Sequence, residues 1–167
     1  MINKINKLSK SEFIKVFANI FENATWIAEK LYAQKPFHDF DELKLKMLDI
    51  FEAITKEKKL KILNDHPDLG DKTKIGLLSS NSLKEQTNVG LDQCTKEEFD
   101  EFKKLNNEYK KFGFPFILAI KGKTKIEILE NFKRRIYSNS EKEFKEAVNQ
   151  VKKIASLRLE ELKNKNF

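Results

Sequence analysis

The residues best suited to acid–base chemistry lie in one stretch, residues 66–92. His66 is one of two histidines in the chain and is followed at once by Pro67. Because the fixed φ and missing N–H of proline oppose helix continuation, we expect the imidazole to lie where a helix gives way to a turn. An imidazole has an unperturbed pKa of about 6.5, so it can take up or release a proton near neutral pH. The sequence therefore offers a general acid or base at the mouth of a loop.

A carboxylate and a carboxamide follow in the same stretch. Residues 82–86 read Ser-Leu-Lys-Glu-Gln, so Glu85 lies beside Gln86, and the three groups can face one cavity. Each signal also has a purely structural interpretation. Ser82 and Glu85 have the spacing of a capping box, and His66 fits a helix-end histidine stabilised by the helix dipole. On spacing alone, these structural interpretations are favoured.

Several motifs recur in a fixed order along the chain. They are H-P-D-L at 66–69, S-x-x-E-Q at 82–86, G-L-D at 90–92 and N-x-x-Y-K-x-F-G-F-P-F-I at 106–117. Glu22, the segments 26–29 and 36–37, and the closing segment 154–159 extend the pattern towards both ends. In this order and at these distances the motifs resemble the OHCU decarboxylases, which act on 2-oxo-4-hydroxy-4-carboxy-5-ureidoimidazoline (OHCU) in urate breakdown. One departure is Val89, where the family commonly has alanine.

The resemblance implies decarboxylation of OHCU to (S)-allantoin without a cofactor. The substrate carboxylate lies beside a ring C=N bond, which can accept the electrons that departing CO₂ leaves behind. The implied catalytic residues are His66 as acid or base, Glu85 as the group that orients the imidazole, and Arg158 as the donor to a carbonyl or developing anion. The implied substrate-binding residues are Pro67, Ser82, Gln86, Phe116 and Ile117. Gln86 would read the ureido group, and the backbone near Phe116 and Ile117 would complete the polar lining.

The charge balance supports an anionic substrate and leaves other functions open. The chain has 33 basic and 26 acidic residues and a net charge of +7, and all but three of the basic residues are lysine. Exposed lysines are usually solvated surface, although a positive field also favours capture of an anion. A basic helical nucleic-acid-binding module is therefore one alternative, although no arginine-rich stripe supports it. A non-enzymatic interaction protein with the same fold is the other.

The sequence offers no metal cage or cofactor motif. Cys94 is the one cysteine, and neither C-x-x-C nor H-x-x-x-H occurs, so we predict no metal and no cofactor. The longest apolar run, residues 112–120, is broken by Gly113 and Pro115, which is unlike a membrane span. We predict a cytoplasmic protein whose partner is a small anionic ureidoimidazoline, without nucleic acid or membrane as partners, and leave a homodimer open.

Apolar residues recur at helical spacing along most of the chain, and no stretch alternates as a strand would. We expect helices over 9–31, two within 41–64, and others over 95–112, 125–137 and 140–163. Capping boxes are predicted at Ser9–Glu12, Thr95–Glu98 and Ser140–Glu143. A chain of 167 residues has the length of one domain. The predicted fold is an all-α, single-domain helical bundle of roughly seven to nine helices covering residues 1–167.

The sequence also indicates the environment of three residues or segments outside residues 66–92. Residues 113–117 contain proline and glycine but are too apolar for a solvent loop, so their backbone needs hydrogen-bond partners, and a polar ligand is one way to supply them. Arg158 lies on the apolar stripe of the last helix, where a guanidinium is costly without an acid or a ligand beside it. His38 lies in a polar turn and is interpreted as surface.

Overall fold

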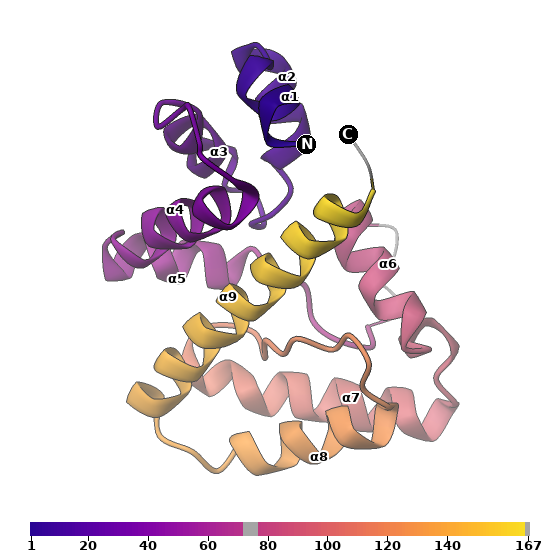
Figure 1. Ribbon diagram of the computed structural model, residues 1–167. Helices are drawn as coiled ribbons and strands as arrows, with labels where there is room; N and C mark the ends of the chain where they lie inside the picture. The colour runs from indigo at the N-terminus through magenta and orange to yellow at the C-terminus, as the bar shows by residue number, and fades with distance from the viewer. Residues whose placement is uncertain (72–76, 166–167) are drawn as a thin grey trace. The chain divides into compact units, whose positions relative to one another are not determined.

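In the computed structural model, which describes residues 1–71 and 77–165, every regular element of the described residues is a helix (Figure 1). The chain divides into two compact units, Met1–Ile62 with Lys152–Phe167 and Leu63–Val151. Helices α5 (Lys56–Asn64) and α9 (Ser140–Asn164) each contain residues of both units, and a single domain over residues 1–167 stays a prediction. The all-α class is confirmed, with nine α-helices in the described part of the chain. No helix there is both long and apolar enough to cross a membrane.

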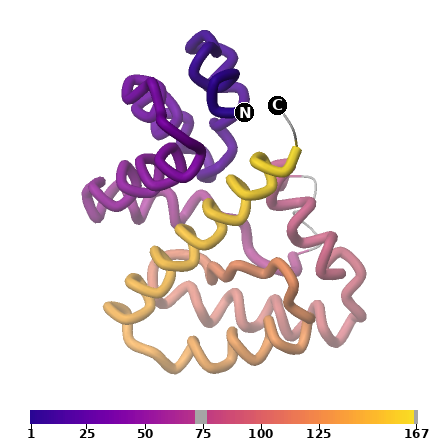
Figure 2. The backbone as a smooth tube through the Cα atoms, in the orientation of Figure 1, coloured from indigo at the N-terminus to yellow at the C-terminus, as the bar shows by residue number. Residues whose placement is uncertain are grey.

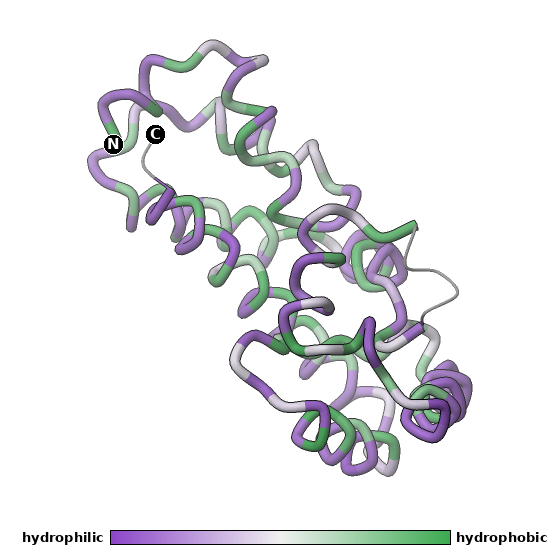
Figure 3. The backbone as a smooth tube through the Cα atoms, turned by 90° about the vertical axis from the view of Figure 1, so that its right-hand side faces the viewer, coloured by the Kyte–Doolittle hydropathy of each residue, from purple (hydrophilic) through white to green (hydrophobic). Residues whose placement is uncertain are grey.

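The first unit contains α1 (Ile2–Lys7), α2 (Lys10–Phe17), α3 (Thr25–Tyr32), α4 (Phe40–Glu52) and the end of α9. Helix α3 contacts both α2 and α4. Their inward faces bury a largely aromatic and aliphatic core that includes Phe13, Phe17, Leu31, Leu43 and Phe51. Green and purple alternate around the helical turns in Figure 3, as expected for helices that bury one face.

The prediction of one continuous helix over 9–31 is wrong. The Ser9–Glu12 capping box forms as predicted and begins α2, but the helix ends at Phe17 and a new one starts at Thr25. Asn23 adopts a left-handed φ of 48°, and the carbonyls of Asn19 and Ile20 accept hydrogen bonds from Arg158. Apolar residues keep helical spacing through this break, so the local pattern did not reveal it.

The second unit contains α6 (Ser80–Asn88), α7 (Lys96–Tyr109), α8 (Lys125–Arg135) and the start of α9. Two short 3-10 helices, η2 (Leu91–Gln93) and η3 (Lys110–Phe112), follow α6 and α7. Helices α7 and α8 lie side by side, and Figure 2 shows the irregular segment that connects them in the sequence. Capping boxes begin both helices: Thr95–Glu98 was predicted, whereas Thr124–Glu127 was not.

Two predicted capping boxes are wrong. Helix α6 starts earlier than expected, with Ser79 as its N-cap, so Ser82 lies inside the helix and is buried. At the start of α9, the side chain of Asn139 accepts the N–H of Lys142 at 2.9 Å. Glu143 is instead buried against Arg135, with its carboxylate 2.9 Å from the guanidinium, so it does not cap the helix.

Candidate active site

His66 lies where the sequence predicted, in the turn that follows a helix. Helix α5 ends at Asn64, and the N–H of His66 donates to the carbonyl of Leu63 at 3.2 Å. The residue is only 9% exposed, so its imidazole is enclosed by protein rather than displayed on the surface. Pro67 follows outside any helix. This burial disagrees with a simple surface histidine at a helix end.

A cavity of about 560 Å³ lies beside the His66 loop, and its size suits a small ring compound. Residues 64–68 line one part of it, and Gly113, Phe114 and Pro115 line another. Asp65, Asp68 and Lys110 contribute charged groups, while Pro67, Phe114 and Pro115 contribute apolar surface. The cavity therefore combines a titratable imidazole with rigid apolar walls and a few polar groups.

Two buried carboxamides hold the loop that carries His66. Gln86 on α6 accepts the N–H of Gly70 at 3.0 Å and donates to the carbonyl of Asp68 at 3.2 Å. Asn106 on α7 donates to the carbonyl of Leu69 at 2.9 Å. These hydrogen bonds tie the loop to two helices, and so they restrict where the imidazole can lie.

Gly70 lets this loop approach α7 closely. Its φ is +69°, a left-handed conformation that favours glycine, and an added Cβ would lie 2.8 Å from the ring of Phe102. Phe102 is itself completely buried. The turn after H-P-D-L therefore requires glycine for both conformation and space.

The G-F-P-F-I segment is irregular, and its side chains Phe114, Phe116 and Ile117 are buried, whereas Gly113 is exposed. The carbonyl of Gly113 accepts a hydrogen bond from Asn64 at 3.1 Å, which joins this segment to the end of α5. The ring of Phe116 stacks on Phe132 with centroids 3.9 Å apart, and Ile117 is 2% exposed. Protein groups, rather than a ligand alone, thus satisfy part of the backbone here.

Arg158 belongs to the first unit. Its Nη2 contacts the carboxylate of Glu22 at 2.9 Å, with the two side chains only 5% and 7% exposed, and its Nη1 donates to two main-chain carbonyls. The expectation that this buried guanidinium meets an acid or a ligand is confirmed for the acid. Because His66 belongs to the second unit, the convergence of Arg158 and His66 on one hollow stays a prediction.

The chain matches a known protein family along most of its length. A family model described as OHCU decarboxylase matches residues 6–160, which is nearly the whole chain and includes both units. The chain belongs to the OHCU decarboxylase family. The resemblance seen in the ordered motifs is therefore confirmed.

Individual OHCU decarboxylase relatives agree with this assignment. The chain is 35% identical over 162 residues to the 2-oxo-4-hydroxy-4-carboxy-5-ureidoimidazoline decarboxylase of Halalkalicoccus jeotgali, covering 96% of this chain and 90% of that protein. It is 40% identical over 162 residues to a uric acid degradation bifunctional protein of Bacillus sp. (strain TB-90), covering 96% of this chain. The crystal structure of an (S)-allantoin synthase matches with a TM-score of 0.77 and 28% identity over 97% of this chain.

Two of these relatives are much longer than the chain. It spans 32% of the Bacillus bifunctional protein and 54% of the (S)-allantoin synthase. Their additional activities and partners therefore have no counterpart established for this OHCU decarboxylase family member.

The candidate residues of this OHCU decarboxylase family member fall into three groups. His66 and Pro67 line the cavity, and Gln86 holds the loop that carries them. Phe116 and Ile117 lie directly after the residues that form the cavity's other wall. Ser82, buried, and Glu85, half-buried, lie on α6, where residues three and four apart share a face, so the helix can present them with Gln86. Their contacts with a substrate stay predictions.

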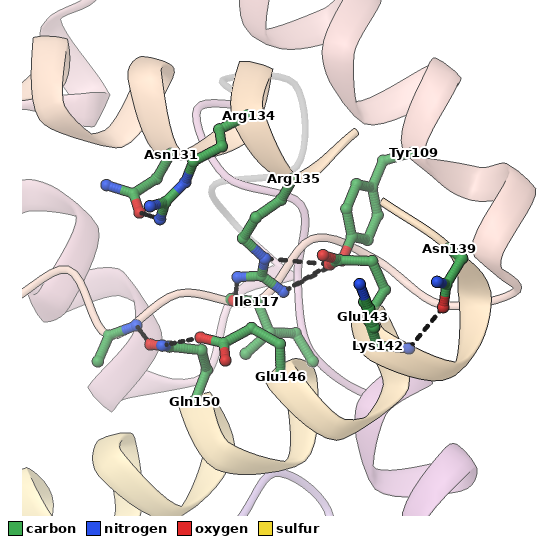
Figure 4. Close-up of polar contacts among 11 residues, drawn as sticks. Tyr109, Ile117, Asn131, Arg134, Arg135, Asn139, Lys142, Glu143, Glu146 and Gln150 are labelled. Carbon is green, nitrogen blue, oxygen red and sulfur yellow. Dashed lines mark hydrogen bonds and ion pairs between the residues drawn. The ribbon is translucent and has the colours of Figure 1, made fainter. Parts of the chain in front are cut away.

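A buried cluster around Arg135 was not predicted from the sequence (Figure 4). Arg135 is 5% exposed and its Nη2 lies 2.9 Å from the carboxylate of Glu143, which also accepts the hydroxyl of Tyr109. Burial raises the pKa of the Tyr109 hydroxyl well above its usual range, so it remains a hydrogen-bond donor. The available signal was the presence of arginine in a lysine-rich chain, since two of its three arginines are buried.

Proposed function

We propose that this protein catalyses the cofactor-independent decarboxylation of OHCU to (S)-allantoin, as a carboxy-lyase of urate breakdown. The observation that carries the proposal is the family match over residues 6–160, with His66 of the matching H-P-D-L motif buried on the wall of a cavity. Family membership supports the reaction, and the cavity supports a small substrate. We further propose that the protein acts in the cytoplasm, with a homodimer left open.

In the proposed reaction, the substrate's C–CO₂ bond breaks and its electron pair moves into the adjacent ring C=N bond. His66 acts as the acid or base near the leaving carboxylate and hydroxyl, since an imidazole exchanges protons near neutral pH. Glu85 orients that imidazole and accepts an N–H of the ring or the ureido group. One proton delivered to one face of the ring then gives the S product.

Gln86 can both support the loop and bind the substrate. A carboxamide has two N–H donors and two lone pairs on oxygen. Its bonds to Asp68 and Gly70 use one N–H and one lone pair, so one of each remains for a ureido group. Ser82, Pro67 and the backbone near Phe116 and Ile117 complete the proposed lining.

Arg158 is proposed to donate to a substrate carbonyl or to the developing anion. Glu22 fixes the orientation of its guanidinium, because the buried ion pair leaves little rotational freedom. A preorganised donor of this kind is worth about 2.7–4 kcal/mol in other enzymes when it faces the charge that develops in the transition state. Removing it is therefore expected to lower kcat rather than to raise KM alone.

The test compares the chain's two histidines. Freshly generated OHCU is followed by circular dichroism with the wild-type protein, His66→Ala and His38→Ala, since excess optically active allantoin separates enzymatic turnover from spontaneous decay. We expect loss of at least about 100-fold in kcat for His66→Ala, because a positioned acid or base contributes about that much or more. His38 is a matched control, with a side chain 89% exposed, and its variant should keep wild-type turnover. Unchanged turnover in folded His66→Ala would eliminate the proposed mechanism.

A further inference from the structure

Three helices of the second unit each contribute one residue to a buried polar cluster. Tyr109 comes from α7, Arg135 from α8 and Glu143 from α9. Nε of Arg135 donates to the Glu143 carboxylate at 3.0 Å, and Nη2 donates to the Tyr109 hydroxyl at 3.1 Å. The two charged side chains are 6% and 3% exposed. In Figure 4 their polar ends point toward one another, away from the neighbouring Arg134.

The cluster also binds the main chain of the segment that follows Pro115. Nη1 of Arg135 donates to the carbonyl of Ile117 at 2.7 Å, and its guanidinium lies over the ring of Phe116, 4.6 Å from the centroid. Two residues further on, the N–H of Ala119 donates to Gln150 on α9 at 2.9 Å. Side chains of α8 and α9 thus supply hydrogen bonds that a regular helix would have supplied internally.

The same segment reaches the cavity beside His66. Gly113, Phe114 and Pro115 line that cavity, and the ring of Tyr109 makes edge contacts with both Phe114 and Phe116. The cluster therefore touches the segment from its buried side, while residues 113–115 face the cavity. A shift of the cluster would be transmitted to that wall through Phe116 and Ile117.

Stability alone does not account for this buried ion pair. Taking both charges out of water carries a desolvation cost, and replacement of such pairs by apolar residues of similar volume is often neutral or stabilising. What apolar residues cannot do is donate directed hydrogen bonds to a chosen carbonyl. The guanidinium does so for Ile117 while its Nε and Nη2 are held by Glu143 and Tyr109.

We propose that Arg135, Glu143 and Tyr109 are positioning residues, which set the backbone of residues 113–117 so that the wall of the His66 cavity fits the substrate. This inference rests on the proposed decarboxylase function. None of the three needs to touch the substrate. Misplacement by about 1 Å at a distance from the chemistry can cost about 100-fold in rate, which gives the scale of the effect.

The test uses a triple variant that replaces the whole cluster by apolar groups, Arg135→Met, Glu143→Leu and Tyr109→Phe, so that no member is left buried with a charge. We expect Tm within a few degrees of wild type, faster amide hydrogen exchange confined to peptides covering 113–119, and kcat/KM lower by about 10- to 100-fold. Arg134→Met is the matched control: Arg134 is exposed and bonds Asn131, so turnover and exchange should stay at wild-type values.

The outcomes separate positioning from general support of the fold. General support predicts that Tm falls and that exchange rises throughout α7, α8 and α9, with activity lost in proportion. A folded triple variant with wild-type kcat/KM, or with unchanged exchange over 113–119, overturns the proposal. If the triple variant does not fold, Tyr109→Phe and Arg135→Lys are measured in the same way, because each removes part of the hydrogen-bond network and keeps most of the packing.

A different set of results is expected if the protein is not a decarboxylase. Wild-type protein would then show no excess of optically active allantoin, whereas the exchange measurement on 113–119 would still report whether the cluster orders that segment. If the wild-type protein converts OHCU and the folded variants do so at the same rate, the positioning role is rejected. The decarboxylase function is then still supported.

Discussion

Gln86, Asn106 and Arg135 share one task at the residue scale. Each is buried and donates a hydrogen bond to a main-chain carbonyl of a segment that carries candidate site residues. Neither the H-P-D-L-G loop nor the G-F-P-F-I segment forms a regular helix, so their buried carbonyls depend on such donors. Irregular backbone at the site is therefore held by specific side chains.

A glycine pair tests the fit of the His66 loop. Gly70→Ala and Gly122→Ala both place alanine at positive φ, of +69° and +76°, but only at Gly70 does the new Cβ meet a neighbour, 2.8 Å from Phe102. We expect Gly122→Ala to lower the free energy of unfolding by about 1–2 kcal/mol. Gly70→Ala should cost more and also lower kcat/KM, because the loop must move. Equal effects in urea denaturation would contradict the packing argument.

Arg158→Ala is predicted to lower stability as well as activity. The variant removes the guanidinium that compensates the buried Glu22 carboxylate, and breaking a buried ion pair costs about 3–5 kcal/mol. In a domain of this size that corresponds to a fall in Tm of roughly 6–20 °C. Lys153→Ala, at an exposed position of the same helix, should leave Tm almost unchanged. A thermal scan that shows both variants equal to wild type would reject the structural role of the pair.

At the element scale, helix starts are stabilised by carboxylates that accept backbone N–H groups. Glu12, Asp39 and Glu127 do so at α2, α4 and α8. Backbone and side-chain hydrogen bonds from Thr124 lower the pKa of Glu127 below its ordinary 4.5, and hydrogen bonds at the starts of α2 and α4 lower the pKa of Glu12 and Asp39 likewise. The folded state therefore favours the ionised carboxylates.

The sign of the resulting pH dependence follows from these lowered pKa values. The stabilisation is present above the ordinary pKa of the carboxylates and is lost as pH falls through 4.5 and below. We expect Tm to be nearly constant from about pH 7 to 5.5 and to fall at lower pH. Glu127→Gln, which keeps a capping side chain but cannot ionise, should show a shallower acid decline than wild type. Glu130→Gln, an exposed position one turn away, should retain the wild-type slope.

At the scale of the whole molecule, the net charge of +7 is the property most relevant to substrate capture. A positive field raises the encounter rate with an anion, and dissolved salt screens that field over distances of about 10 Å at 0.1 M. The same charge also motivates the alternative of nucleic-acid binding. Capture of an anionic substrate and binding of nucleic acid predict different results at moderate salt concentration.

We expect kcat/KM for OHCU to fall by roughly 2- to 5-fold between about 20 and 200 mM salt, with kcat unchanged, because screening affects encounter and not chemistry. Steady-state kinetics across this range provide the measurement. An electrophoretic mobility assay at the upper salt concentration should show no shift of duplex DNA or RNA. A retained shift would favour the nucleic-acid-binding alternative.

Local sequence patterns determined much of the fold. Helical spacing and S/T-x-x-E signals predicted the starts of α2 and α7, and proline after His66 predicted the turn that follows α5. These features depend on residues within a few positions of one another, which is why they can be read along the chain. The family, too, followed from the order of short motifs, and the match over 6–160 confirms it.

Only the tertiary structure showed which residues the buried charged side chains contact. Arg158 meets Glu22 across 136 positions of sequence, and its bonds to Asn19 and Ile20 accompany the break that local periodicity missed. Glu143 has the spacing of a cap for α9 but lies against Arg135, eight positions earlier in the sequence and on a different helix. Periodicity records which face of a helix is apolar. It does not record which distant side chain that face will meet.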